Sequence, residues 1–260
     1  MDYKTLIYET SDDGVATVTL NRPDRLNSFT RQMGDEFVDL WRRVREDDKV
    51  KAVVLRAAGD KAFSTGADVK EGGWSRKEEG PFFAEDPGPS LAPKQNRVWK
   101  PVVAAVHGMC AGGAFYWINE SDIVICSEDA HFFDPHVTFG MVCAVEPVGL
   151  LARMPLGDIT RMVLLGNDER ISAQTALAMR LVSEVTPRDR LWARAHELAA
   201  IIARKPSAAI QGTVRALWEA QDLPRSAAVN NALKYCQLGN PIGTAEVDRW
   251  NMPKAKWTLR

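Results

Sequence analysis

Two short segments of the chain combine small residues with a change from apolar to polar sequence. The first runs from Phe63 to Glu71 and contains Gly66-Ala67-Asp68, and the second runs from Lys100 into Gly112-Gly113-Ala114. Each is typical of a buried strand that turns into a loop or a helix. Such a junction leaves backbone N–H groups accessible, because no large side chain covers them. Two such groups directed at one point would stabilise an oxyanion.

Both segments resemble the oxyanion-hole signatures of the enoyl-CoA hydratase/isomerase (crotonase) family, and the similarity extends from about Tyr3 to Val185 and more loosely to the end. The resemblance implies that the backbone N–H groups of Ala67 and Gly113 bind the thioester oxygen of an acyl-CoA. Gly113 is also expected to open a helix, so that the positive end of the helix dipole faces the same oxygen.

A further resemblance concerns the segment Asn21 to Asn27, which is similar to the family region that meets the CoA nucleotide. It implies a coenzyme A contact surface formed by Arg25, Leu26, Ala67, Asp68 and Val69. An arginine suits a phosphate group, although Arg25 as a solvated surface residue is the alternative. We expect no cofactor beyond the coenzyme A that the substrate carries.

The two glutamates with which hydratases of this family hold water are both replaced. Alignment on the glycine-rich helix start places Tyr116 at the first position, and alignment on Asp134-Pro135-His136 places His136 at the second. A tyrosine with a pKa of about 10 is a poor base near pH 7, but it can orient a ligand or donate a proton. A histidine retains proton-transfer chemistry at its position.

The sharpest hypothesis for this site is a dyad of His136 and Glu146, ten residues apart in the sequence. The Glu146 carboxylate would fix the imidazole tautomer and raise its basicity. The base would then activate water or move a proton along the acyl chain. The alternative is that His136 hydrogen-bonds the core and that Glu146 is a surface acid or a helix-start acid beside Pro147.

The remaining candidate residues are interpreted as structural. His107, His131 and His196 lie in strand or helix patterns, and Glu120 is an unfavoured substitute for the missing carboxylate because it lies one helical turn beyond Tyr116. The histidines show no ligand spacing, so no metal site is expected. The four cysteines lie far apart, which is typical of reduced thiols.

Periodicity predicts an α/β protein that begins with a hairpin around Asp12-Asp13-Gly14. Thr30 is expected to cap a helix, and strands are expected near Val50 to Leu55, Asp122 to Cys126 and Ala130 to Phe133. Residues 72–93 form a long aperiodic loop, whose Trp74, Phe82 and Phe83 are expected to face a pocket or to anchor the loop. Ser172 is expected to cap a helix, and further helices are expected over about 191–202, 207–221 and 224–237.

The family resemblance implies a crotonase-like spiral of ββα units with a helical C-terminal trimerisation region. We divide the chain into a spiral core with the CoA cleft and oxyanion hole over residues 1–190 and a helical C-terminal region over residues 191–260. A homotrimer or hexamer is the expected assembly.

Composition limits the possible partners. Lys and Arg number 33 against 34 Asp and Glu, so the net charge of −1 gives no general attraction to nucleic acid or to an anionic membrane. The chain shows no secretory signal and no apolar run of about 20 residues, so a cytoplasmic protein without a membrane span is expected.

Three functions remain in competition. The first, which we favour because the CoA segment and both oxyanion signatures occur together, is an acyl-CoA hydratase or isomerase of fatty-acid metabolism that stabilises a thioester enolate. The second is a hydrolase that cleaves a ketone or thioester with His136 and Glu146. The third is a catalytically silent acyl-CoA-binding protein.

Overall fold

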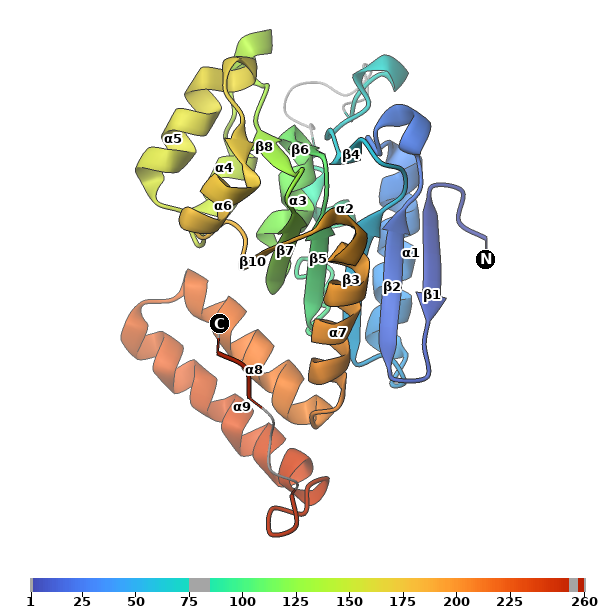
Figure 1. Cartoon of the computed structure of the whole chain (residues 1–260). Coiled ribbons are helices and arrows are strands. Elements are labelled where there is room, and N and C mark those ends of the chain that lie inside the picture. The colour runs from blue at the N-terminus through green and yellow to red at the C-terminus, as the bar shows by residue number, and fades with distance from the viewer. Residues whose placement is uncertain (1, 75–84, 253–256, 260) are drawn as a thin grey trace.

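The computed structural model describes residues 2–74, 85–252 and 257–259 and contains two β-sheets with helices on both sides (Figure 1). The larger sheet has six strands in the order β1-β2-β3-β5-β7-β10. These strands are Leu6–Thr10, Val15–Leu20, Ala52–Ala57, Val102–Val106, Ile123–Ser127 and Glu184–Thr186. The smaller sheet has the order β4-β6-β8-β9, with strands Ala62–Ser64, Met109–Ala111, His131–Phe133 and Ile171–Ser172.

The chain alternates between the two sheets as it advances. Strands β3, β5 and β7 enter the larger sheet as parallel neighbours, and each is followed along the chain by β4, β6 or β8 in the smaller sheet. Strands β4, β6 and β8 are also mutually parallel. Their carboxyl ends therefore meet at one edge, and the loops that follow these strands are brought together there.

The predicted first hairpin and first helix are present. Strands β1 and β2 pair antiparallel with Leu6 opposite Leu20. Helix α1 (Arg31–Glu46) begins at Thr30, whose hydroxyl accepts a hydrogen bond from the Met33 N–H. Its buried face carries apolar side chains three and four positions apart, which pack on the larger sheet: Met33, Phe37, Leu40, Trp41 and Val44.

Helix α7 (Leu191–Ala203) covers the opposite face of the larger sheet. Its small buried residues Ala195, Ala199 and Ala203 contact the strands closely, together with Leu191, in a second apolar cluster. The first helix of the predicted C-terminal region, which starts at residue 191, therefore packs against the larger sheet as part of the core. The later helices α8 (Ser207–Glu219) and α9 (Arg225–Ala245) lie side by side below the sheets (Figure 1).

Helix α9 is longer than predicted, because it continues through Pro241. The α8–α9 pair is attached to the core by Trp218, whose indole N–H donates to Asp122 Oδ1 at 2.7 Å. The remaining helices are short and surround the smaller sheet and its loops: α2 (Gly88–Leu91), α3 (Phe115–Asn119), α4 (Val145–Leu150), α5 (Leu156–Leu165) and α6 (Ala173–Ala178).

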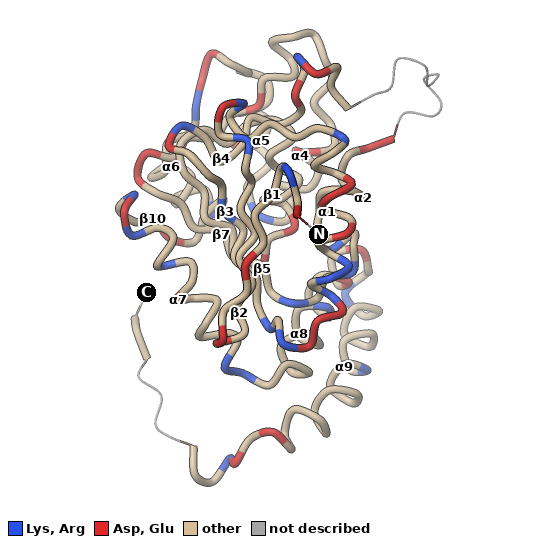
Figure 2. The backbone as a smooth tube through the Cα atoms, turned by 90° about the vertical axis from the view of Figure 1, so that its right-hand side faces the viewer, with Lys and Arg blue, Asp and Glu red and all other residues tan. Residues whose placement is uncertain are grey.

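Charged residues of both signs are interspersed along the chain, as Figure 2 shows, in agreement with the near-neutral net charge. Among the described residues, none of the helices has both the length and the apolar character that a membrane span needs. Three aromatic residues of the long loop were expected to face a pocket or to anchor the loop. Of these, Trp74 is described, whereas Phe82 and Phe83 lie outside the described residues.

Candidate functional site

The loops after β4 and β6 touch through backbone atoms at two glycines. A Cβ on Gly66, which has a φ of +83°, would lie 2.7 Å from the Gly113 nitrogen and 3.1 Å from the Ala111 oxygen. A Cβ on Gly113 would lie 2.6 Å from Cε1 of Phe29. The distances of 2.7 and 2.6 Å are too short for a real Cβ, so glycine at position 66 permits the approach of the two loops, and glycine at position 113 permits the approach of the Phe29 ring.

The N–H of Ala67 points away from the segment around Phe29, which pairs with residues 66–68. Phe29 N donates to the Gly66 oxygen at 2.8 Å, and Asp68 N donates to the Phe29 oxygen at 2.9 Å. Because successive N–H groups of an extended chain alternate in direction, the Ala67 N–H points to the other side. In the described part of the chain, neither Ala67 nor Gly113 is a donor in the turn, loop and cap hydrogen bonds.

The predicted CoA contact residues lie on neighbouring turns. Arg22, which was not predicted as a site residue, connects these turns. The Arg22 guanidinium donates to the Ser28 oxygen at 2.6 Å and lies 3.0 Å from Asp68 Oδ2. Asp68 is buried and caps the turn Val69–Glu71 by accepting from two N–H groups. Burial alone would raise the pKa of Asp68, but these hydrogen bonds and Arg22 lower it. The Asp68 carboxylate is thus engaged within the protein.

The other predicted CoA contacts are more accessible. Val69 is 76% exposed and Arg25 is exposed, while Leu26 is half-buried and has a φ of +52° at the end of the turn Pro23–Arg25. An apolar side chain and a guanidinium held on adjacent turns can contact a ligand that has both apolar and phosphate groups.

The loop after β8 carries His136, whose imidazole lies between two carboxylates. Nδ1 is 2.6 Å from Oδ1 of Asp134, which is 1% exposed, and Nε2 is 3.8 Å from Oε1 of Glu146. The hydrogen bond to Asp134 raises the pKa of His136, against the opposing effect of burial. With Nδ1–H donating to Asp134, Nε2 is free to accept a proton.

The predicted tautomer-fixing role of Glu146 is therefore taken by Asp134. Glu146 and His136 are brought together, but 3.8 Å exceeds hydrogen-bond distance. In the sequence, Asp134 is distinguished only as part of the motif that places His136. The available signal was its position two residues before His136, where an aspartate turn brings carboxylate and imidazole together. Burial raises the pKa of Glu146, which lies in the first turn of α4.

Tyr116 lies on α3 immediately after the glycine turn, and its hydroxyl is paired with a carboxylate, Asp86, that sequence reasoning missed. Its hydroxyl donates to Asp86 Oδ2 at 2.6 Å, and the side chain is 7% exposed. Burial, followed by the hydrogen bond to Asp86, raises the pKa of Tyr116 far above its ordinary value. Tyr116 therefore stays protonated near neutral pH and is not a base there.

A third feature of this region is a cluster of potential metal ligands, which differs from the expectation of no metal site. Single ligand atoms of Asp134, His136 and Cys143 all lie within 4.8 Å of one another. These are ligand types that Zn²⁺ accepts. Nδ1 of His136 is at hydrogen-bond distance from Asp134, however, so the arrangement itself is that of a hydrogen-bonded carboxylate–imidazole pair.

The residues interpreted as structural lie away from this site. Glu120 accepts from the Lys94 and Gln95 N–H groups at 2.6 and 3.0 Å, so it caps a loop and does not replace the missing carboxylate. His107 is fully buried, and burial lowers its pKa to about 4. His131 Nε2 lies 2.9 Å from Arg170, and His196 Nε2 lies 2.9 Å from Asp13.

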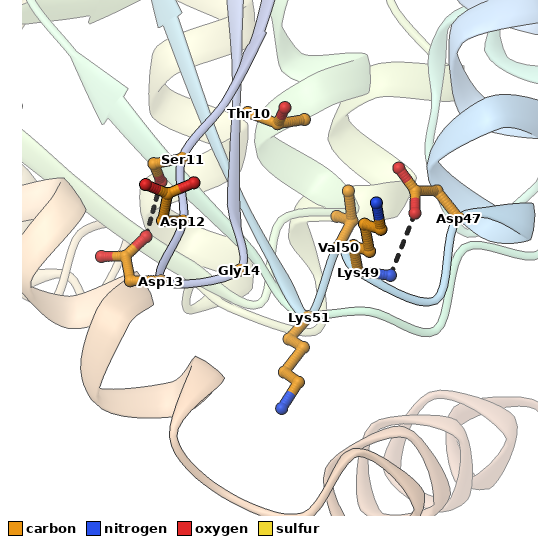
Figure 3. Close-up of a pocket in the computed structure, with 9 residues that line it drawn as sticks. All are labelled: Thr10, Ser11, Asp12, Asp13, Gly14, Asp47, Lys49, Val50 and Lys51. Carbon is orange, nitrogen blue, oxygen red and sulfur yellow. Dashed lines mark hydrogen bonds between the residues drawn. The ribbon is translucent and has the colours of Figure 1, made fainter.

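Two further features are separate from the proton chemistry. Trp74 packs edge-on against Phe29, with ring centroids 5.8 Å apart, and so anchors the start of the long loop near Gly113. The pocket in Figure 3 lies between the β1–β2 turn and the residues before β3, and Lys51 extends beside it. It therefore occupies the amino ends of β2 and β3, opposite to the strand ends that carry the site.

Comparisons with known proteins show the family to which the chain belongs. The family model described as Enoyl-CoA hydratase/isomerase matches residues 10–217. The chain is 32% identical over 211 residues to an (E)-benzylidenesuccinyl-CoA hydratase from Thauera aromatica, covering 81% of each chain. It is 29% identical to a mitochondrial Delta(3,5)-Delta(2,4)-dienoyl-CoA isomerase from Dictyostelium discoideum, covering 85% of this chain and 79% of the other.

A solved structure is similar over nearly the whole chain. An enoyl-CoA hydratase/isomerase from Mycobacterium paratuberculosis superposes with a TM-score of 0.83 at 36% identity, covering 91% of both chains. The predicted crotonase fold is thereby confirmed. The chain belongs to the enoyl-CoA hydratase/isomerase family.

Proposed function

We propose that this enzyme hydrates or isomerises the double bond of an enoyl-CoA and binds the thioester oxygen at the N–H groups of Ala67 and Gly113. The single observation that carries the proposal is the contact of the two glycine loops after β4 and β6, with His136 at the end of the adjacent β8. The similarity to a hydratase and to an isomerase that both act on CoA thioesters supports the same reaction class.

The oxyanion site accounts for the electrostatic part of the reaction. Deprotonation at the α-carbon, or attack at the β-carbon, moves negative charge onto the thioester oxygen. One preorganised donor contributes about 3–4 kcal/mol to the stability of such a transition state. The Gly113 N–H lies in the turn Gly112–Ala114, and a Cβ added at Gly113 would meet the ring of Phe29 at 2.6 Å.

His136 supplies the base in this proposal. The buried Asp134 carboxylate accepts a hydrogen bond from Nδ1–H, so Nε2 faces Glu146 and can receive a proton from water or from the substrate carbon. Glu146, whose pKa burial raises, can exchange that proton with the imidazolium or deliver it to the α-carbon. The coenzyme A part would lie along Arg25, Leu26, Val69 and the backbone at Asp68, and no other cofactor is required.

The direct test is a panel of enoyl-CoA substrates that differ in chain length and double-bond position. Conversion is measured by loss of the conjugated thioester absorbance and by mass spectrometry of the products. The chain should convert at least one substrate, and His136→Ala should reduce kcat by about a hundredfold or more, as expected for an acid–base residue. His196→Ala is the matched control, because that exposed histidine pairs with Asp13 outside the site.

One observation favours a second candidate, a hydrolase that uses His136 to activate water. The 2.6 Å contact with Asp134 gives the imidazole the same orientation that nucleophilic hydrolases require. Hydrolysis of β-diketones without coenzyme A, abolished in His136→Ala and accompanied by no conversion of enoyl-CoA, would replace the first proposal. Binding of an acyl-CoA without any turnover would instead indicate a silent binding protein.

We also propose that the enzyme assembles as a trimer or a pair of trimers through its C-terminal helices. Helix α9 carries exposed apolar side chains that a monomer would leave in water, among them Val229, Leu233, Leu238 and Ile242. Light scattering after size-exclusion chromatography should give three or six times the mass of one chain. A monomer mass would contradict this assembly without affecting the catalytic proposal.

A further inference from the structure

The Tyr116 hydroxyl has one proton to donate, and it donates it in the hydrogen bond to Asp86. Asp86 precedes α2, and both of its carboxylate oxygens are used, because Oδ2 accepts from Tyr116 at 2.6 Å and Oδ1 accepts from the Gly88 N–H at 2.8 Å. The carboxylate is therefore held in one orientation by the start of α2. The phenol proton is in turn held by the carboxylate.

A phenol has one donor and can also accept, so this pairing determines what Tyr116 offers to a ligand. Since the proton is directed at Asp86, the remaining lone pairs of Oη can only accept hydrogen bonds. A buried phenol whose pKa is raised by burial does not lose that proton near pH 7. Tyr116 therefore presents an acceptor oxygen, as a carboxylate would, without carrying a charge.

Tyr116 shares its surroundings with the two groups to which we assign proton transfer. Helix α3, which carries Tyr116, contacts α4 through Asn119, whose Nδ2 donates to the Glu146 carbonyl at 2.9 Å. Glu146 Oε1 in turn lies 3.8 Å from Nε2 of His136. The charge of Asp86 contributes to the raised pKa of Glu146, and the charge of Glu146 contributes to the raised pKa of Tyr116.

We propose that Tyr116 and Asp86 form one unit that binds the nucleophilic water of a hydration reaction. This proposal rests on the proposed function and narrows it to hydration. The Tyr116 oxygen accepts a hydrogen bond from one O–H of the water, while His136 removes the proton of the other O–H. The water oxygen bonds to the β-carbon, and the π electrons move to the thioester oxygen. The thioester C=O bond then re-forms, and the α-carbon takes up the proton that His136 removed from the water, directly or through Glu146. Tyr116 holds the water, and Asp86 is a positioning residue that acts through Tyr116.

The test is a kinetic cycle of Tyr116→Phe, Asp86→Asn and the double variant in the full-length enzyme. Asn at position 86 can still accept from the Gly88 N–H, but its amide donates to Oη and so turns the phenol proton toward the water. Each single variant should lower kcat of hydration about tenfold to a hundredfold with KM nearly unchanged, because a misplaced nucleophile slows the chemical step. The double variant should be no slower than the slower single variant, because the two residues act as one unit.

Tyr3 and Asp39 provide a matched control pair. The Tyr3 hydroxyl donates to Asp39 Oδ2 at 2.8 Å outside the site, so Tyr3→Phe and Asp39→Asn should leave hydration within twofold of the unchanged enzyme. Hydration that is unaffected by Asp86→Asn, or additive losses in the double variant, would overturn the inference. So would an enzyme that isomerises enoyl-CoA but adds no water to it, an outcome that leaves the proposed function standing.

A measurement without substrate separates the inference from the proposed function. A crystal structure should show an ordered water within hydrogen-bond distance of Tyr116 Oη, and this water should be absent in Tyr116→Phe. If the enzyme converts no enoyl-CoA but the water is present, the proposed function fails, and the role of the pair in hydration fails with it, while binding of a water by Tyr116 is established. If no water is bound at Oη, the pair is refuted whatever the enzyme converts.

Discussion

Asp134 Oδ1 lies 2.6 Å from Nδ1 of His136, and this contact determines what the imidazole can do. The carboxylate is almost completely buried and also accepts from the His136 backbone N–H at 3.0 Å. The imidazole is thus held in one tautomer with Nε2 toward Glu146. In the proposed mechanism, the acid–base function of His136 therefore depends on this pair rather than on a direct hydrogen bond between His136 and Glu146.

Replacing Asp134 with asparagine should lower kcat strongly while the acyl-CoA affinity changes little. The asparagine can present its amide to Nδ1, which favours the wrong tautomer and removes the stabilisation of the imidazolium. A loss of about a hundredfold or more is expected for a misoriented catalytic histidine. Steady-state kinetics together with calorimetric titration of an acyl-CoA measures both quantities. An Asp134→Asn enzyme with unchanged kcat would show that His136 needs no carboxylate partner.

The pH dependence follows from the direction of the His136 pKa shift. Because the hydrogen bond to Asp134 raises this pKa above 6.5, the free base forms at higher pH than in an ordinary histidine. The kcat/KM profile should therefore rise with pH and reach half its maximum above 6.5. In Asp134→Asn the midpoint should move to lower pH. A midpoint at or below 6.5 in the unchanged enzyme would contradict the assigned role of Asp134.

The same shift affects stability with a definite sign. A group whose pKa is raised by folding stabilises the folded state fully below its unfolded pKa, and it loses this contribution as the pH rises through the folded pKa. The stability difference between the unchanged protein and His136→Gln should therefore be larger at pH 5.5 than at pH 8.5. Chemical denaturation at the two pH values measures it, and equal differences would exclude this linkage.

Much of the fold could be predicted from local sequence signals. Thr30 caps a helix with a regular apolar stripe, and Ser172 accepts from the Thr175 N–H at the start of α6 (Ala173–Ala178), as expected. Helix α9 ends later than expected, because it continues through Pro241, a residue type that usually stops a helix. The position of α7 could not be predicted from its apolar residues, because their spacing predicts a buried helix face but not which face of the sheet that helix covers.

The candidate site was predictable only where residues are part of a recognisable motif. Gly66, Gly113 and His136 belong to such segments, so the sequence alone singles them out as candidates. Asp86 was missed because it follows a long aperiodic loop, where no periodicity predicts that the chain returns to Tyr116. Cys143 was missed because its proximity to His136 depends on the tertiary course of the loop after β8.

Replacing Gly66 with alanine should disrupt the contact between the two glycine loops after β4 and β6. The new Cβ would meet backbone atoms of Gly113 at 2.7 Å, at a positive φ that alanine rarely adopts. A loss of stability of about 1–3 kcal/mol is expected for such overpacking, together with a reduced kcat. Gly157→Ala is the control, because its Cβ meets nothing within 4 Å and it lies in α5. A Gly66→Ala enzyme with unchanged stability and kcat would show that the loops do not need this approach.

Zinc ions should inhibit the enzyme by binding the cluster of Asp134, His136 and Cys143, whose ligand atoms lie within 4.8 Å of one another. Coordination would withdraw His136 from proton transfer. Activity titrated with Zn²⁺ should fall at lower concentration in the unchanged enzyme than in Cys143→Ser, and EDTA should restore it. Equal sensitivity of the two enzymes would show that Cys143 takes no part in binding.

The central claim is tested most directly by a crystal structure of the enzyme with a bound acyl-CoA. The measurement is the pair of distances from the thioester carbonyl oxygen to the backbone nitrogens of Ala67 and Gly113. The account predicts that both are about 2.7–3.1 Å, as in a preorganised oxyanion site. A carbonyl oxygen that contacts only one of these nitrogens, or that lies in another part of the molecule, would contradict it.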